Sequence, residues 1–206
     1  VISGLTIASG KAETGEESLG GGILNEGELT LAGVVVEGNE AKATGSSVVI
    51  GNGGGVANLP GAALTIERST LAGNTAGAVA SSGVAYGDGG AVFNEGALTI
   101  SDSTISGNGA IAAGGGGQSA SGGGIANVLS SPLAVSSSTV VGNTVISSAL
   151  RSGANVLATG TAEFENTIVA EPEGATNCAA AVTSHGFDLE DEDSCGFDQA
   201  TDQPDT

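Results

Sequence analysis

The side chains that could do acid–base chemistry are few and scattered along the sequence. His185 is the only histidine, and it lies in the C-terminal tail, far from the repeats described below. The four basic residues are Lys11, Lys42, Arg68 and Arg151. Cleavage of a uronate or another glycan needs clustered carboxylates with a histidine or a base beside them. Because no such cluster recurs, we expect a non-enzymatic protein, with a carbohydrate-active lyase or hydrolase as an alternative.

Two cysteines are the other candidates for chemistry. Cys178 and Cys195 both lie in the tail. A metal site is disfavoured because the chain has one histidine and no second cysteine pair, which leaves a disulfide or two free thiols. We predict the disulfide, and with it an oxidising compartment. The expected location is therefore extracellular or at the cell surface, and no cofactor is expected.

The composition restricts the elements that could position these residues. Glycine accounts for 37 of the 206 residues and aromatic residues for 2%, whereas 39% are hydrophobic. These values argue against collagen, which needs a Gly-X-Y period, and against disorder. The net charge of −19 disfavours nucleic acids and anionic membrane surfaces as partners. No segment is long and apolar enough to insert into a membrane, so short strands between glycine-rich turns are expected.

One sequence pattern recurs along the chain. The stretch GGAVFNEGALTISDSTISGN at residues 89–108 has counterparts that begin at Gly20, Gly53 and Gly122, with a degenerate copy at Gly153. Each copy holds three short apolar segments, and the middle one alternates apolar residues with threonine, as a half-buried strand does. Strands too short to fold alone can stack on those of the next copy. The pattern predicts a parallel β-helix of about five to six turns with about three strands per turn.

Aligned copies place like residues in columns. Asparagine recurs at two corners of the expected coil, where it tolerates left-handed backbone and can bridge amides along the stack. One structural ladder is Asn25, Asn58, Asn94 and Asn127, and the other is Asn39, Asn74, Asn108 and Asn143. One outward threonine column, in the middle segment of successive copies, contains Thr30, Thr65 and Thr99. Another, in the third segment, contains Thr70, Thr104, Thr139 and Thr167. Because such columns repeat at the strand spacing, ice binding is a second alternative function.

The consensus GGGIxN…LTLxxSTxxGN resembles the repeat of right-handed parallel β-helices in large bacterial surface proteins, among them the polymorphic outer-membrane-protein-like and choice-of-anchor families. The resemblance covers nearly the whole chain, and the tail ENTIVA…NCAAAVTSHGFDLEDEDSCGF is similar to the closing segment of such proteins. It implies a right-handed β-helix of the pectin-lyase-like kind. It also implies an exported, surface-displayed, non-enzymatic protein of which this chain is one segment.

The chain divides into repeats at residues 1–170 and an acidic, cysteine-containing cap at residues 171–206. A solenoid needs its apolar end covered, and three tail residues are expected to lie over the last turn. These are Phe187, Leu189 and Phe197. The acidic residues from Asp188 to Asp193 are expected to face water, with a weak Ca²⁺ site there as an alternative. No cap precedes the first turn, which predicts end-to-end contacts through its apolar residues.

The segments between copies form the expected binding surface. They vary in length, as loops do, and should stack along one edge of the rod. They are residues 11–19, 40–52, 75–88, 109–121 and 144–152, and extra strands are the alternative interpretation of their apolar runs. Tyr86, Asp88 and Arg151 are the candidate binding residues on this edge, for a glycan or a protein partner. The predicted function is a structural or adhesive module of a larger exported protein.

Overall fold

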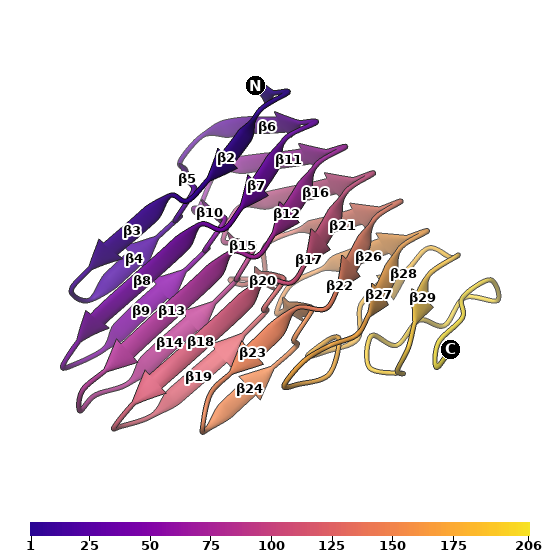
Figure 1. Cartoon of the computed structure of the whole chain (residues 1–206). Coiled ribbons are helices and arrows are strands. Elements are labelled where there is room, and N and C mark those ends of the chain that lie inside the picture. Colours follow the sequence, from indigo (N-terminus) through magenta and orange to yellow (C-terminus); the bar gives the residue numbers. More distant parts are fainter.

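The computed structural model describes residues 1–206 as an all-β solenoid without a helix (Figure 1). Its strands pair in parallel and form five sheets, which we label A to E. Successive strands of one sheet belong to successive turns of the coil, so each sheet is a stack of like segments. The predicted parallel β-solenoid is confirmed.

The strands of the five sheets have the following bounds. Sheet A contains β1 (Ile2–Ser3), β6 (Glu28–Ala32), β11 (Ala63–Glu67), β16 (Ala97–Ser101), β21 (Leu133–Ser136), β26 (Ala162–Glu165) and β28 (Thr183–Ser184). Sheet B contains β2 (Thr6–Ala8), β7 (Val35–Glu37), β12 (Thr70–Ala72), β17 (Thr104–Ser106), β22 (Thr139–Val141), β27 (Ile168–Ala170) and β29 (Leu189–Glu190). Sheet C contains β3 (Lys11–Thr14), β8 (Glu40–Gly45), β13 (Thr75–Ala80), β18 (Gly109–Gly114) and β23 (Thr144–Ile146). Sheet D contains β4 (Glu17–Leu19), β9 (Val49–Asn52), β14 (Ala85–Asp88), β19 (Gln118–Ser121) and β24 (Leu150–Ser152). Sheet E contains β5 (Ile23–Asn25), β10 (Val56–Asn58), β15 (Val92–Asn94), β20 (Ile125–Asn127) and β25 (Val156–Ala158).

A complete turn passes through sheets E, A, B, C and D in that order. About four turns are complete, from β5 to β24, with partial turns at both ends. The predicted number of turns and the predicted three strands per turn are therefore wrong. The error in strands per turn arises because the segments interpreted as long loops form sheets C and D, and the number of turns was too high because partial turns at both ends were counted. Alanine and glycine dominate these segments, and both are depleted in ordinary strands.

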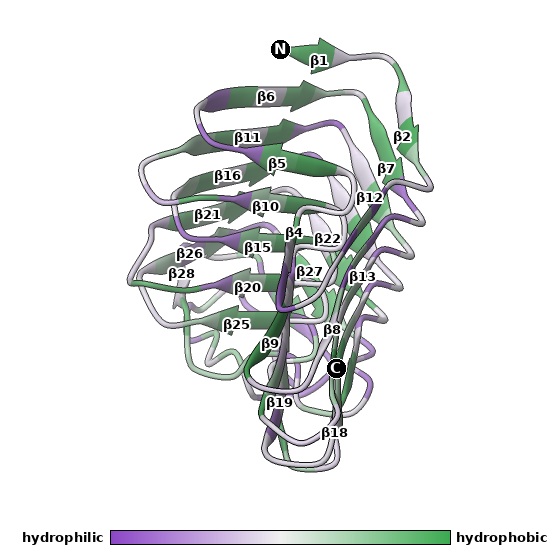
Figure 2. Cartoon of the chain, turned by 90° about the vertical axis from the view of Figure 1, so that its left-hand side faces the viewer, coloured by the Kyte–Doolittle hydropathy of each residue, from purple (hydrophilic) through white to green (hydrophobic).

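The cross-section contains two separate apolar cores. The larger core has 23 buried residues, among them Ile66, Ile100 and Ile105, and lies between sheets A, B and E. The smaller core has 10 buried residues, mostly alanine, and lies between sheets C and D. Figure 2 shows sheets C and D side by side as a narrow projection, which we call the fin. A Cβ added at Gly51 would lie 2.0 Å from the carbonyl oxygen of Gly77, so the two backbones of the fin are in close contact.

The glycines that open each copy form the neck between the two cores. Gly89 has a φ of +71°, in the left-handed region that suits the turn from sheet D to sheet E. A Cβ added at Gly54 would lie 2.4 Å from the carbonyl carbon of Thr75, the first residue of β13. A side chain at this position would therefore collide with the base of the fin. Equivalent close approaches occur at Gly21, Gly90 and Gly123.

Asparagine side chains form two hydrogen-bonded ladders along the rod. In each ladder, the Nδ2 of one asparagine donates to the Oδ1 of the asparagine one turn further on, at 2.6–2.9 Å. The ladder that contains Asn143 continues through Asn155 and Asn177, beyond the residues expected from the repeats. Its last Nδ2 donates to carboxylate oxygens of Glu190 and Asp191. Acceptors without hydrogens thus close the donor end of the ladder.

A third ladder, which the sequence analysis missed, follows the corner between sheets A and B. The backbone N–H groups of Val34, Ser69 and Ser103 each donate to the Oγ of a serine one turn further on, at 3.1 Å. The last of these serines is Ser138. Serine suits this corner because its hydroxyl can also donate to a carbonyl two residues earlier, as Ser138 does to Ser136.

Thr167 belongs to this corner and does not belong to an outward column. It is fully buried, and its N–H donates to Oδ1 of Asp188 at 2.8 Å. The residue that pairs with Thr139 is Ile168, which is 42% exposed. The predicted column is therefore wrong at Thr167. In the last copy, threonine takes the place of the ladder serine, and this shifts the alignment by one residue.

The tail covers the C-terminal end of the larger core. The predicted disulfide between Cys178 and Cys195 is present, and both cysteines are buried. Phe197 is also buried and packs on Phe164, with ring centroids 6.1 Å apart. Strands β28 and β29 each extend a sheet of the coil. The cap is thus continuous with the solenoid through two sheets.

Three expectations for the tail are wrong. Phe187 is 65% exposed and does not cover the last turn. Asp188 and Glu190 do not face water, since they are 1% and 0% exposed. Both carboxylates are buried because they accept hydrogen bonds from the ladder ends and from the cap, including the N–H of Cys195 at 2.9 Å.

Candidate functional site

Tyr86, Asp88 and Arg151 lie on strands of sheet D, so the edge expected to consist of loops is a sheet. Tyr86 and Asp88 are two residues apart on β14 and share its outer face. Arg151 lies on β24, two turns further along the sheet, and its register partner is Ala120. Because Ala120 points into the core of the fin, Arg151 stands in a different column. The three side chains do not converge on one site.

Asp88 lies in a column of polar side chains on the outer face of sheet D. Its register neighbours, Asn52 and Ser121, are each 6% exposed. The hydroxyl of Ser121 donates to Oδ1 of Asp88. Burial raises the pKa of Asp88 from 3.8 to about 6, although the hydrogen bonds from Ser121 act in the opposite direction. Asp88 is therefore a carboxyl group whose pKa of about 6 lies well above that of an exposed aspartate.

Asn52 leaves an acceptor unused beside this carboxyl group. Its Oδ1 is buried and has no hydrogen-bond partner. A carboxyl group gains one O–H donor when it is protonated, so a neutral Asp88 can supply the missing donor in the column. The column is thus suited to hold a proton inside sheet D.

Two threonine columns occupy outer faces of the coil. Register neighbours in sheet A are Thr30, Thr65 and Thr99, and those in sheet B are Thr70, Thr104 and Thr139. None of the six is buried. Ala134 follows the first column, and Val35 and Ile168 flank the second. Each column thus spans three turns.

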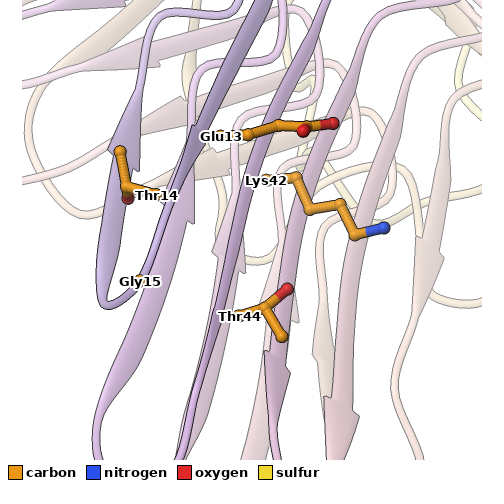
Figure 3. A pocket seen from close by; sticks show the side chains of 5 residues that line it. All are labelled: Glu13, Thr14, Gly15, Lys42 and Thr44. Carbon is orange, nitrogen blue, oxygen red and sulfur yellow. The ribbon is translucent and has the colours of Figure 1, made fainter.

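Shallow depressions mark the surface at both ends of the rod. One, of about 390 Å³, lies on sheet C near the N-terminal end and is lined by polar residues including Glu13, Lys42 and Thr44. Figure 3 shows Glu13 and Lys42 extending in the same direction from neighbouring strands. Another, of about 470 Å³, lies at the corner of sheets A and B beside Asn166 and Phe187.

His185 lies closer to the repeats than the sequence indicates. Strand β28 pairs with β26, and this places Nε2 of His185 at 3.6 Å from Oε2 of Glu163. Glu165 lies with these two residues in the lining of a depression of about 210 Å³. Carboxylates and an imidazole are the groups that general acid–base catalysis uses. Both partners are more than half exposed, so water competes with their interaction.

The acidic tail and the rest of the chain contain no group of three or more His, Cys, Asp or Glu side chains arranged to bind a metal ion. The structure also contains no helix that could span a membrane. Family models, curated proteins and solved structures were compared with the chain, and none matches.

Proposed function

We propose that this chain is a structural or adhesive module of an exported surface protein and has no catalytic role. The observation that carries the proposal is that most of the hydrogen-bonded polar side chains point inward. Asparagine side chains bind one another along the rod, and corner serines accept from backbone N–H groups. Two buried carboxylates accept hydrogen bonds at the ladder ends. Such an arrangement stabilises a long scaffold and offers broad surfaces for contact.

The disulfide of the cap supports export. Disulfides persist in oxidising compartments and are rare in reducing ones. The bond between Cys178 and Cys195 joins segments that are 17 residues apart and closes the end of the larger core. We also infer a right-handed coil, because crossovers between parallel strands of one sheet are right-handed in nearly all proteins.

A glycan screen with two readouts tests the proposal. Immobilised acidic and neutral polysaccharides are scored for binding of the chain and for release of soluble product. We expect no release of soluble product, whether or not the chain binds the polysaccharide. Product release that disappears in Glu163→Gln and His185→Ala, but persists in the control Glu37→Gln, would establish an enzyme and refute the proposal.

Ice binding is a second candidate because Thr70, Thr104 and Thr139 form a register column on sheet B. Their hydroxyl and methyl groups repeat at the strand spacing of about 4.8 Å. Thermal hysteresis that is lost in Thr104→Tyr, and kept in Thr65→Tyr on sheet A, would select this function. A chain without thermal hysteresis eliminates it.

A further inference from the structure

The last corner between sheets A and B contains one residue more than the earlier corners. Residues 165–167 connect the register positions of Phe164 in sheet A and Ile168 in sheet B, and three residues connect the equivalent positions on every earlier turn. In the cap, the partners of these two positions are Ser184 and Leu189, which are connected by the four residues 185–188. The cap therefore carries an insertion at this corner, beside β29 (Figure 1). In repeat proteins, insertions often lie on the binding face.

Phe187 stands in this insertion with its ring toward the solvent. It is 65% exposed, whereas the other three phenylalanines of the chain are at most 6% exposed. Its φ of +63° is a left-handed conformation that is strained for a bulky residue. On the earlier turns, the residues at this corner position have φ between 48° and 61° and are glycine, polar or charged: Gly33, Arg68, Asp102, Ser137 and Asn166. Because an exposed ring adds little to packing, stability does not account for a phenylalanine here.

Hydrogen bonds on both sides fix the backbone of Phe187. Its N–H donates to Oγ1 of Thr201 at 3.1 Å, and the N–H of the next residue, Asp188, donates to Oδ1 of Asp202 at 3.0 Å. The carboxylate of Asp188 turns inward, where it accepts from the N–H of Thr167 at 2.8 Å. The ring is therefore presented on a prearranged backbone, which lowers the entropy cost of binding a ligand.

The depression of about 470 Å³ beside Phe187, which we call the corner hollow, has the volume of a small-molecule site. Phe187, Ile168 and Leu189 form its apolar part. Ile168 and Leu189 continue the outward column of Thr139 along sheet B, and Ile168 is 42% exposed. The column thus changes from threonine to branched apolar side chains at the point where the ring stands.

Neutral polar groups form the rest of the lining. Nδ2 of Asn166 donates to Oγ of Ser137 at 3.2 Å, which orients the amide and leaves its Oδ1 as an acceptor. Thr139 adds a hydroxyl group and Gln203 adds an amide. The only ionisable residue of the lining is Asp188, which is 1% exposed. The corner hollow thus offers an apolar surface beside hydrogen-bonding groups that carry no charge.

The charges around the corner hollow select against anionic ligands. Residues 171–206 contain ten acidic residues and no lysine or arginine. A uronate, sulfate or phosphate group would be repelled there and would find no cation to bind. A cationic ligand would find no exposed carboxylate in the lining. A neutral ligand therefore fits the corner hollow best.

We propose that the corner hollow binds a neutral sugar unit of a glycan. A pyranose ring carries C–H groups on its faces and hydroxyl groups around its rim. A C–H face packs on Phe187 and Ile168. The hydroxyl groups exchange hydrogen bonds with Asn166, Thr139 and Gln203. This binding rests on the adhesive role proposed above and gives it a ligand class.

Titration of the whole chain with neutral hexasaccharides of glucose, mannose and N-acetylglucosamine tests the proposal, with hexagalacturonate as the anionic probe. The protein is labelled with ¹³C in its phenylalanine rings. At least one neutral sugar should shift the ring signals of Phe187, whereas the signals of the three buried phenylalanines should stay in place. Saturation-transfer NMR detects the protons of the bound sugar in the same samples and in unlabelled variants.

Variants test the ring and the amide as the contacts. Phe187→Gly should weaken binding at least about tenfold, and its melting temperature should stay the same or rise because glycine suits the positive φ. Phe187→Tyr keeps an aromatic face and should retain binding. Asn166→Gly should weaken binding about three- to tenfold. The matched control, Tyr86→Ala, removes the other exposed aromatic side chain, on sheet D, and should leave binding unchanged.

Several outcomes would overturn the sugar site. If no neutral hexasaccharide shifts the Phe187 signals, the site is refuted and the structural role remains. Binding of hexagalacturonate alone, or binding that survives Phe187→Gly, refutes it as well. Shifts that depend on protein concentration without sugar, and that Phe187→Gly abolishes, would show that a second copy fills the corner hollow. Release of shorter sugars would instead contradict the proposed non-catalytic function, whichever sugar binds.

Discussion

Replacing Asp88 with asparagine should stabilise the protein at neutral pH. The carboxyl group of Asp88 has a pKa raised from 3.8 to about 6 by burial. Well below pH 3.8 it is protonated in both the folded and the unfolded chain, so it has no effect on the pH dependence there. Between pH 4 and 6 the unfolded chain releases the proton first, and the free energy of unfolding falls as pH rises.

The size of this effect follows from the two pKa values. A difference between 3.8 and about 6 corresponds to about 3 kcal/mol of lost stability above pH 6. Asp88→Asn removes this loss because the amide stays neutral. The amide oxygen can still accept from Ser121, and the amide nitrogen can donate to the unpartnered Oδ1 of Asn52. The variant should therefore approach about 3 kcal/mol of added stability at pH 7.

Urea denaturation of both proteins from pH 4 to pH 7 measures this difference directly. Subtracting the two curves cancels the contributions of the other carboxylates. The stability gain of Asp88→Asn should grow between pH 4 and 6 and then level off. A gain that is independent of pH, or a variant that is less stable at pH 7, would refute the reasoning about burial.

Three further predictions follow from the packing. Reduction of the Cys178–Cys195 disulfide, which spans 17 residues, should cost about 3 kcal/mol in urea denaturation, and an unchanged midpoint would show that the cap is not fixed by the bond. Asn108→Ala should cost about 1–3 kcal/mol for each ladder group left without a partner, and a loss near zero would contradict the ladder as a source of stability. Gly54→Ala should lower the melting temperature strongly because its Cβ would lie 2.4 Å from Thr75, whereas Gly15→Ala, with open space around it, should have little effect. Equal effects of the two substitutions would contradict the close backbone contact at the neck.

The sequence was most informative where spacing is rigid. Leu64, Leu98 and Leu133 recur at nearly constant intervals, and they are register neighbours in sheet A. Spacing of this kind predicts a stack because a one-residue slip would turn every apolar residue outward. The same reasoning failed in the last copy, where Thr167 replaces a ladder serine and Ile168 turns outward.

The fin was harder to predict from the sequence. Its core consists mainly of alanine, and segments rich in alanine and glycine are easily interpreted as loops. Its stability depends on close backbone contact such as that at Gly51. The buried acids of the tail were missed for a related reason. Asp188 and Glu190 lie in a run of charges that is usually solvated, and only the three-dimensional ends of the ladders show why they are buried.

The candidate binding residues were chosen because the segments that form sheets C and D were interpreted as loops. Tyr86 and Asp88 do share an outer face, but Arg151 stands in the inward column of sheet D. Neighbours across the strands of sheet C could not be recognised before that sheet was known. Gly77 and Ile111 are 34 residues apart in the chain and become neighbours only through the register of β13 and β18.

Amide hydrogen exchange of residues 75–88 and 109–121 tests the central claim most directly, because the neck and the Asp88 column both require sheets C and D. The structure predicts slow exchange at Ala78 and Ala112, comparable to that of Ile100 in the larger core, since these positions are buried within paired strands. Fast exchange throughout both segments, with Ile100 protected, would show that they are loops and would contradict the five-strand turn.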